Sequence, residues 1–254
     1  MTGVPRNDRR RPARLLHTSD CHLARDEGGP AQLAFQAVVN LAIARRVDVL
    51  LIAGDLFDHS RVGPEIVLWV ADQLNRFPGS VVLLIGNHDC LDDASVHHRH
   101  DLRQVCDRLF MLDDPDGASV DLPGSDITVW GRAMVEHAPE FQPLFNAPVG
   151  RADRWSVIAA HGLLDAEAGR SSPIRSSELA DLTADYVALG HIHVHTVVRE
   201  NPPIRYSGAP HAYGSGGSGC VVVDFISGEG AIAEWVSTDD YVTVSPELAL
   251  THLP

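Results

Sequence analysis

The sequence contains no apolar run long enough to cross a membrane, and it holds few cysteines. A membrane-spanning helix needs roughly 20 consecutive apolar residues, and the runs in this chain are much shorter. The first 14 residues contain five arginines but lack the apolar core of a secretory signal. The four cysteines, Cys21, Cys90, Cys106 and Cys220, form no closely spaced CxxC pair. These absences favour reduced thiols and a cytoplasmic location, with no membrane partner.

Basic charge is also scarce. The 254 residues include 20 basic and 34 acidic side chains, which gives a formal net charge of −14. This balance argues against a broadly basic nucleic-acid surface, although carboxylates gathered at one site can be neutralised by bound cations. The arginine-rich residues 1–13 are expected to form a flexible tail rather than a nucleic-acid-binding arm. Residues 14–245 are expected to form one domain, and residues 246–254 a C-terminal tail.

The first part of the chain alternates between short apolar runs and amphipathic segments. The runs at 14–18, 47–53 and 81–85 predict buried strands. Apolar residues at helical spacing predict helices over 30–46 and from Pro64 through Leu74. A strand–helix–strand–helix–strand order implies right-handed crossovers and a largely parallel sheet.

The pattern after residue 90 is different. Residues 90–108 are polar and histidine-rich, and predict a loop with a short helix that could select the substrate. A further helix is predicted over 176–182, and the glycine-rich stretch 214–219 predicts a hairpin tip rather than a nucleotide loop. Short strands separated by turn residues are predicted at 109–112, 118–122, 127–131, 155–160, 186–189, 195–199, 204–206, 219–225 and 231–236. This half is therefore expected to supply a second sheet that packs on the first.

Residues of the kind that bind metals follow or end five of the predicted strands. A lone histidine is usually a satisfied surface or core residue, so one such segment would be weak grounds for a metal site. Five in order, each after an apolar strand, are much more specific, because open α/β sheets place their chemistry at the carboxyl ends of strands. The segments are Asp20-Cys21-His22, Gly54-Asp55, Gly86-Asn87-His88-Asp89, Ala160-His161-Gly162 and Gly190-His191-Ile192-His193.

In content and order these segments resemble the DxH, GDxxD, GNHD, HG and GHxH motifs of the calcineurin-like metallophosphoesterase superfamily. The resemblance implies an α/β fold, a four-layer α/β/β/α sandwich of two mixed sheets flanked by helices. It also implies two divalent cations, with Mn²⁺ preferred and iron or zinc as alternatives, and a metal-activated hydroxide that attacks phosphorus. One cation would be held by Asp20, His22 and His193, the other by Asn87, His161 and His191, and both by Asp55.

The same resemblance implies roles for two residues beside these ligands. His88 would be the general acid that protonates the leaving oxygen, and Asp58 would be the second carboxylate of GDxxD that orients it. From the residues alone, Asp58 could equally be a turn or helix-capping carboxylate, and Asp89 has the same ambiguity. Cys21 and Cys90 flank ligands and are interpreted as packing residues.

Longer segments are similar to the SbcD-type DNA-repair exonucleases, namely 15–23, 51–58, 186–193 and Tyr206-Ser207-Gly208-Ala209-Pro210. Those enzymes cleave DNA phosphodiesters with manganese and work with an ATPase partner. They continue into a DNA-capping domain, whereas only ten residues follow Val244 here. The expected function is therefore a stand-alone, nuclease-like phosphodiesterase whose substrate could be a nucleic acid or nucleotide, with an ATPase partner doubtful.

Two other interpretations stay open. A phosphomonoesterase or protein phosphatase is disfavoured because His59 and Ser60 follow Asp58, where protein phosphatases carry Arg-Gly. A non-catalytic scaffold of the same fold is disfavoured because all seven ligand positions and His88 are present.

Overall fold

The computed structural model describes residues 9–24, 28–136, 138, 140–166, 172–211 and 217–242. Residues 1–8 of the predicted N-terminal tail, the predicted C-terminal tail, 246–254, and part of the predicted hairpin tip, 214–216, lie outside these described residues. The described residues form two six-stranded mixed sheets, one two-stranded ladder and flanking helices. The predicted fold class is confirmed.

The first sheet has the strand order β14-β13-β1-β2-β3-β4. Four of its strands are parallel: β1 (Ala13–Thr18), β2 (Val49–Ala53), β3 (Ser80–Leu84) and β4 (Leu109–Leu112). The helices α1 (Pro30–Ala44) and α2 (Pro64–Asn75) connect the first three strands, and each begins with proline, as predicted. The strands β13 (Gly219–Ile226) and β14 (Gly230–Ser237) extend the sheet, with β13 antiparallel to β1 and β14 antiparallel to β13.

The second sheet has the order β11-β12-β10-β7-β6-β5. Its strands are β5 (Ala118–Asp121), β6 (Ile127–Gly131), β7 (Trp155–His161), β10 (Tyr186–Gly190), β11 (Thr196–Arg199) and β12 (Ile204–Tyr206). The sequence placed all strands after residue 108 in this sheet. That expectation was wrong for β4, β13 and β14, because an apolar run shows that a strand is buried but not which neighbour completes its hydrogen bonds.

Shorter elements connect these strands. The predicted loop at 90–108 contains the four-residue helix α3 (Val96–Arg99) and the 3₁₀ turn η1 (Leu102–Gln104). The ladder of β8 (Leu163–Leu164) and β9 (Pro173–Ile174) precedes helix α4 (Ser176–Asp181), and η2 (Asp239–Tyr241) follows β14. No helix of the described part of the chain is both long and apolar enough to span a membrane.

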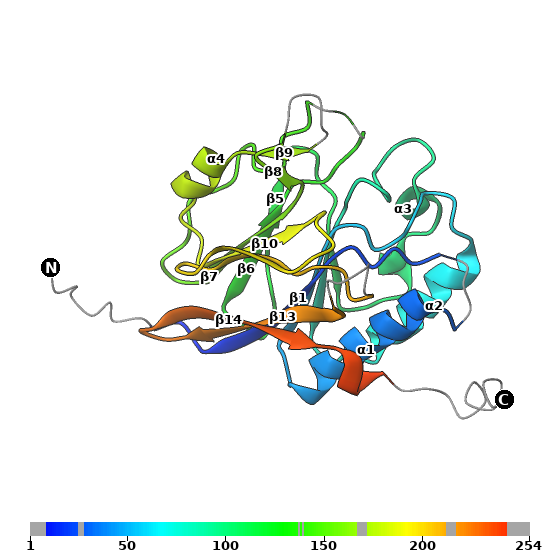
Figure 1. Cartoon of the computed structure of the whole chain (residues 1–254), viewed down its shortest axis with the longest axis horizontal. Coiled ribbons are helices and arrows are strands. Elements are labelled where there is room, and N and C mark those ends of the chain that lie inside the picture. Colours follow the sequence, from blue (N-terminus) through cyan, green and yellow to red (C-terminus); the bar gives the residue numbers. More distant parts are fainter. Residues whose placement is uncertain are drawn as a thin grey trace, which may run out of the picture.

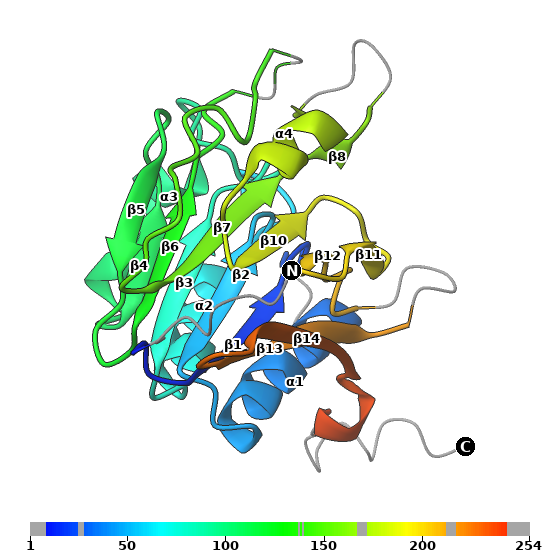
Figure 2. The same cartoon turned by 90° about the vertical axis from the view of Figure 1, so that its left-hand side faces the viewer.

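Apolar side chains fill three successive layers. In β2, Leu50 and Ile52 pack toward α1 and α2, whereas Val49 and Leu51 pack toward the second sheet, as the two-residue alternation of a strand requires. A third cluster lies on the outer face of the second sheet, beneath α4. Figure 1 shows α1 and α2 on one side of the paired sheets and α4 on the other, and Figure 2 shows the strands of the second sheet lying over those of the first.

Two arginines that the sequence assigned to the N-terminal tail contact the second sheet. The guanidinium of Arg10 lies 3.0 Å from a carboxylate oxygen of Asp185 and 3.6 Å from the ring centre of Trp155. Arg11 binds Asp126 at 2.7 Å. The structured region therefore begins before residue 13, and these arginines serve the packing of the chain.

Candidate metal centre

The five ligand-type segments meet because the strands that precede them end at the same edge of the sandwich. In the first sheet β1, β2 and β3 run parallel, and in the second sheet β7 and β10 do so. Main-chain hydrogen bonds then join the segments directly: the Asp20 amide donates to the Gly54 carbonyl at 3.1 Å, and the Gly162 amide donates to the Gly190 carbonyl at 3.2 Å. All seven predicted ligands are thereby brought to one site.

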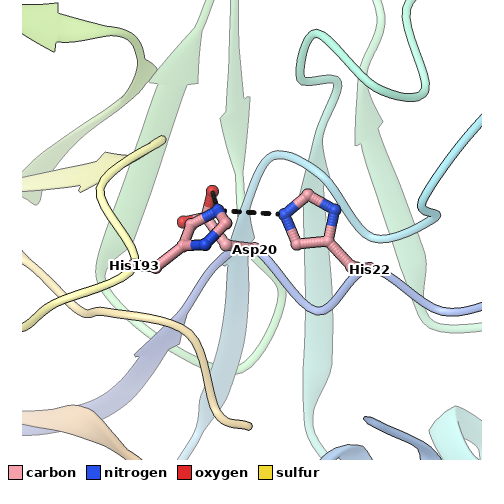
Figure 3. A group of neighbouring side chains, drawn as sticks. All are labelled: Asp20, His22 and His193. Atoms are coloured by element: carbon pink, nitrogen blue, oxygen red, sulfur yellow. Dashed lines mark hydrogen bonds and ion pairs between the residues drawn. The ribbon is translucent and has the colours of Figure 1, made fainter. Parts of the chain in front are cut away.

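Asp20, His22 and His193 form the first group (Figure 3). The Nε2 atoms of His22 and His193 are 3.1 Å apart, and His193 Nε2 lies 3.7 Å from Asp20 Oδ1. Asp20 and His22 come from the segment after β1, and His193 comes from the segment after β10. Asp20 and His22 are buried and His193 is partly exposed, so the group opens toward solvent on the His193 side.

Asn87, His161 and His191 form the second group. The side-chain oxygen of Asn87 lies 3.0 Å from His161 Nε2 and 2.9 Å from His191 Nδ1. Asp55 lies between the two groups, because its Oδ2 is 3.2 Å from His161 Nε2 and 3.9 Å from His22 Nε2. The carboxylate predicted to bridge two cations therefore stands within reach of ligands from both groups.

The electrostatics of this site hold Asp55, His22 and His191 in the forms that metals require, whereas the raised pKa of His161 keeps that ring protonated. Burial opposes ionisation of Asp55, but the nearby positive charge of His161 outweighs it and lowers the pKa of Asp55. Burial likewise opposes charge on His161, and the attraction of Asp55 outweighs it and raises the pKa of His161 to about 10. Burial and the charge of His161 lower the pKa of His191 to about 4, and burial lowers that of His22. Asp55 is thus a carboxylate, and His22 and His191 are neutral imidazoles.

His161 shows what a cation would replace. Its Nδ1 donates a hydrogen bond to the Ala53 carbonyl at 2.8 Å, so Nε2 is the nitrogen that faces Asp55 and Asn87. Without a cation, Nε2 holds a proton between these oxygen atoms. A divalent cation could take the place of that proton while the bond to Ala53 keeps the ring in position. Carboxylate, imidazole and amide donors gathered in this way fit manganese, iron or zinc.

The backbone at the site is held in conformations that residues other than glycine rarely adopt. Asp20, His22, Asp55 and His191 all have positive φ, at 54°, 47°, 53° and 97°. Such conformations are of order 1–3 kcal/mol unfavourable for each residue and cluster at functional sites. The backbone also approaches the ligands closely at Gly86, where an added Cβ would lie 2.1 Å from Asp55 Oδ1. The surrounding structure therefore holds these four residues in strained backbone conformations that bring their side chains to the site.

His88 stands beside these groups with 43% of its side chain exposed. Its Nδ1 lies 2.7 Å from the main-chain carbonyl of Asp58, and because a carbonyl can only accept, Nδ1 carries the proton. The Asp58 carboxylate is 3.8 Å from His88 Nδ1 but 3.2 Å from His22 Nδ1. Sequence reasoning assigned the orientation of His88 to this carboxylate. In the structure the main chain of Asp58 orients His88, and its carboxylate lies against His22.

The ambiguity over Asp89 is resolved in favour of a structural role. This fully buried carboxylate accepts hydrogen bonds from the amides of Gly86, Leu56 and Phe57 at 3.0, 3.1 and 3.2 Å. These donors belong to the segments that carry Asn87 and Asp55, so Asp89 ties the two together. Buried His97, from α3, places Nε2 3.4 Å from Asp89, a contact that sequence reasoning missed because only the folded loop brings it there.

Comparison with known proteins agrees with this geometry. The model of the calcineurin-like phosphoesterase family matches residues 13–195, a range that includes every predicted ligand, His88 and Asp58. The chain is 27% identical over 253 residues to the uncharacterized metallophosphoesterase YhaO of Bacillus subtilis, a match that covers 85% of this chain and 58% of YhaO. It is also 27% identical over 273 residues to the SbcD component of the nuclease SbcCD of the same species, a match that covers 86% of this chain and 68% of that protein.

A solved structure shows the same fold at low sequence identity. The purple acid phosphatase PPD1 from yellow lupin matches 94% of this chain and 53% of its own chain, with a TM-score of 0.55 and 12% identity. The family resemblance drawn from the five motifs is confirmed. The chain spans somewhat more than half the length of YhaO.

Proposed function

The chain belongs to the calcineurin-like phosphoesterase family, and from this premise we propose that it is a binuclear metal-dependent phosphodiesterase with a nuclease-like site. The observation that carries the proposal is the position of Asp55, which lies between two groups of metal-type ligands. Asp20, His22 and His193 would hold one cation, and Asn87, His161 and His191 the other, with Asp55 shared.

Manganese is the proposed metal, with iron or zinc as alternatives for the same donors. Divalent cations in such centres polarise a phosphoryl oxygen and lower the pKa of water so that it can act as a nucleophile. The protein itself supplies ligands fixed by buried hydrogen bonds, such as that from His161 to Ala53. These bonds keep the imidazoles in the orientation that ligation needs.

His88 is proposed to protonate the leaving oxygen. The bond from Nδ1 to the Asp58 carbonyl fixes the ring and leaves Nε2 as the nitrogen that can carry the transferred proton. The exposed fraction of the side chain, 43%, leaves it accessible to a substrate. A general acid of this kind contributes about 10²–10⁴-fold in rate.

A phosphodiester is the proposed substrate class, carried by a nucleic acid or a nucleotide. Support comes from the similarity to the SbcD component of a nuclease. Asp58 is followed by His59 and Ser60, not by the arginine with which protein phosphatases hold a phosphate, and a diester carries less charge than a monoester dianion. The proposed compartment is the cytoplasm, which is consistent with four buried, unpaired cysteines.

The leaving group provides a test of both the substrate class and the acid. With Mn²⁺, we expect kcat/KM for bis-p-nitrophenyl phosphate to exceed that for p-nitrophenyl phosphate. His88→Asn should lower kcat by about 10²–10⁴-fold for a thymidine dinucleotide, whose leaving alkoxide needs a proton. The same variant should have little effect on bis-p-nitrophenyl phosphate, because nitrophenolate leaves without protonation.

The metal content of two variants separates ligand from acid. His88→Asn should retain the bound Mn²⁺ of the wild type, whereas Asn87→Ala should lose metal and activity together. A strong preference for the monoester would remove the diesterase assignment. Loss of metal from His88→Asn would make His88 a ligand instead, as its position near His22 and Asp55 also allows.

A further inference from the structure

The turn from Tyr206 to Ala209 contains no predicted ligand, yet it is buried beneath the metal centre. It begins at Tyr206, the last residue of β12, and Tyr206, Ser207 and Ala209 are at most 1% exposed. The proposed mechanism uses none of these residues. We propose that this turn is a positioning element that holds ligand segments of both cation groups in register. The proposal rests on the proposed function, since the centre that it aligns is the one described above.

The hydroxyl of Tyr206 holds the segment after His161. It donates a hydrogen bond to the Gly162 carbonyl at 2.8 Å and accepts one from the Leu164 amide at 3.0 Å. The ring itself packs in the apolar cluster outside the second sheet. One side-chain oxygen therefore satisfies two main-chain groups within three residues of a predicted ligand.

Ser207 acts on Asp20 through a second serine. Ser19 Oγ donates to the Asp20 carboxylate and lies 2.8 Å from Ser207 Oγ. Each hydroxyl has one proton. Because Ser19 donates its proton to Asp20, Ser207 is the donor of the serine pair, in place of its other acceptor, the Gly208 carbonyl at 3.0 Å. The same carboxylate accepts the His191 amide at 3.1 and 3.0 Å. These bonds leave a fully buried carboxylate little freedom to rotate.

The main chain of the turn holds the segment of His193. The Ala209 amide donates to the His193 carbonyl at 3.1 Å. Gly208 has φ of +75°, and a Cβ there would lie 2.7 Å from the His195 amide nitrogen, so only glycine permits this approach. One turn thus contacts the segments of Asp20 and His193 in the first group and His161 in the second.

Hydrogen-bond partners of metal ligands typically change metal affinity or activity by 10–100-fold when they are removed. Tyr206 and Ser207 act on the ligands through one intervening group, the Gly162 main chain and Ser19 respectively, so we expect Tyr206→Phe and Ser207→Ala each to weaken Mn²⁺ binding by roughly 10-fold, the lower end of that range. Tyr186→Phe is a matched control, because the hydroxyl of this fully buried tyrosine lies 2.8 Å from His17 Nδ1, and His17 is not a predicted ligand. Ser125→Ala is the matched serine control, since its buried hydroxyl accepts from the Ile127 amide.

The measurement is calorimetric titration of Mn²⁺ into chelator-stripped protein, with urea unfolding of the metal-free proteins alongside. The expected result is weaker binding in Tyr206→Phe and Ser207→Ala, and wild-type affinity in both controls. Loss of stability in the two turn variants with unchanged Mn²⁺ affinity would overturn the proposal, because the turn would then serve the fold alone.

The titration also separates this inference from the proposed function. Wild-type protein that binds Mn²⁺ but hydrolyses no phosphoester would contradict the proposed function, and the Mn²⁺ affinities of the turn variants would still test the positioning role. Wild-type protein that binds no Mn²⁺ would contradict both. Wild-type hydrolysis with unaltered affinity in both turn variants would contradict the positioning role alone.

Discussion

Replacement of Asp89 by asparagine tests how the segments that carry Asp55 and Asn87 are held together. The two oxygen atoms of Asp89 accept three main-chain amides, one on Oδ1 and two on Oδ2. An asparagine can present an oxygen to only one of these positions. Its amide nitrogen must then face a main-chain N–H donor.

The loss in the free energy of unfolding of Asp89→Asn follows from the number of main-chain amides that the substitution affects. If the asparagine oxygen replaces Oδ2, the Gly86 amide loses its acceptor, and an unsatisfied buried donor costs about 1–3 kcal/mol. The remaining two bonds lose the assistance of a charge, which roughly halves their strength. We expect the free energy of unfolding to fall by about 2–5 kcal/mol, a large share of the stability of a typical domain. Metal affinity should fall with it.

Urea unfolding of the chelator-treated protein measures this effect. Asp93→Asn is the control, because Asp93 lies exposed in the same loop, and a surface change of this kind usually stays within about 0.5 kcal/mol. The Asp89→Asn midpoint should fall well below that of the control with an unchanged denaturant slope. Equal midpoints for the two variants would refute the reasoning, because the three hydrogen bonds would then contribute nothing.

Three further predictions concern acid sensitivity, backbone geometry and metal binding. Burial lowers the pKa of His17 from 6.5 to about 3, so between these pH values the unfolded chain binds a proton at His17 and the folded chain does not. Below pH 6.5 the free energy of unfolding of chelator-treated wild type should therefore fall by about 1.4 kcal/mol more per pH unit than that of His17→Gln. Parallel pH profiles for the two proteins would contradict this. An added Cβ at Gly54 would lie 2.2 Å from His161 Nδ1, whereas a Cβ at Gly228, which also has positive φ, would meet no neighbouring atom. Gly54→Ala should therefore abolish Mn²⁺ binding in a titration, while Gly228→Ala should only lower the free energy of unfolding in urea by about 1–2 kcal/mol. Mn²⁺ binding by Gly54→Ala would contradict this crowding at His161. Free Mn²⁺ at about 100 times its Kd should raise the free energy of unfolding by about 2.7 kcal/mol, and a melting temperature unchanged by Mn²⁺ would show that the folded state does not bind it.

The convergence of the candidate ligands at one edge of the sandwich could be predicted from the sequence because local signals, topology and the family resemblance agree there. The buried apolar strand β3 ends at Leu84, and Gly86 with the polar residues Asn87, His88 and Asp89 follows within two residues. Parallel strands place such ends at one edge of a sheet, and the resemblance to the family motifs, rather than this topology, assigned residues as distant as Asp20 and His193 to one group. Apolar runs and turn residues also predicted the longer strands to within two residues of their observed bounds, but the two-residue strands β8 and β9 are too short for such a pattern and were not predicted.

Contacts that depend on how segments pack were beyond the sequence. The pattern of Asp58 identifies a carboxylate near the site, but it is the main-chain carbonyl of this residue that binds His88. His97 belongs to a polar loop, and only the fold buries it beside Asp89. The motif around Tyr206 could be seen in the sequence, but its role could not, because the hydrogen bonds of the Tyr206 hydroxyl reach a segment more than 40 residues away along the chain.

Anomalous scattering from crystals of the protein reloaded with Mn²⁺ tests the central claim most directly. We expect two manganese peaks about 3.5–4 Å apart, both in contact with Asp55, one beside Asp20 and His193 and the other beside Asn87 and His161. A single peak, or two peaks of which neither touches Asp55, would contradict it.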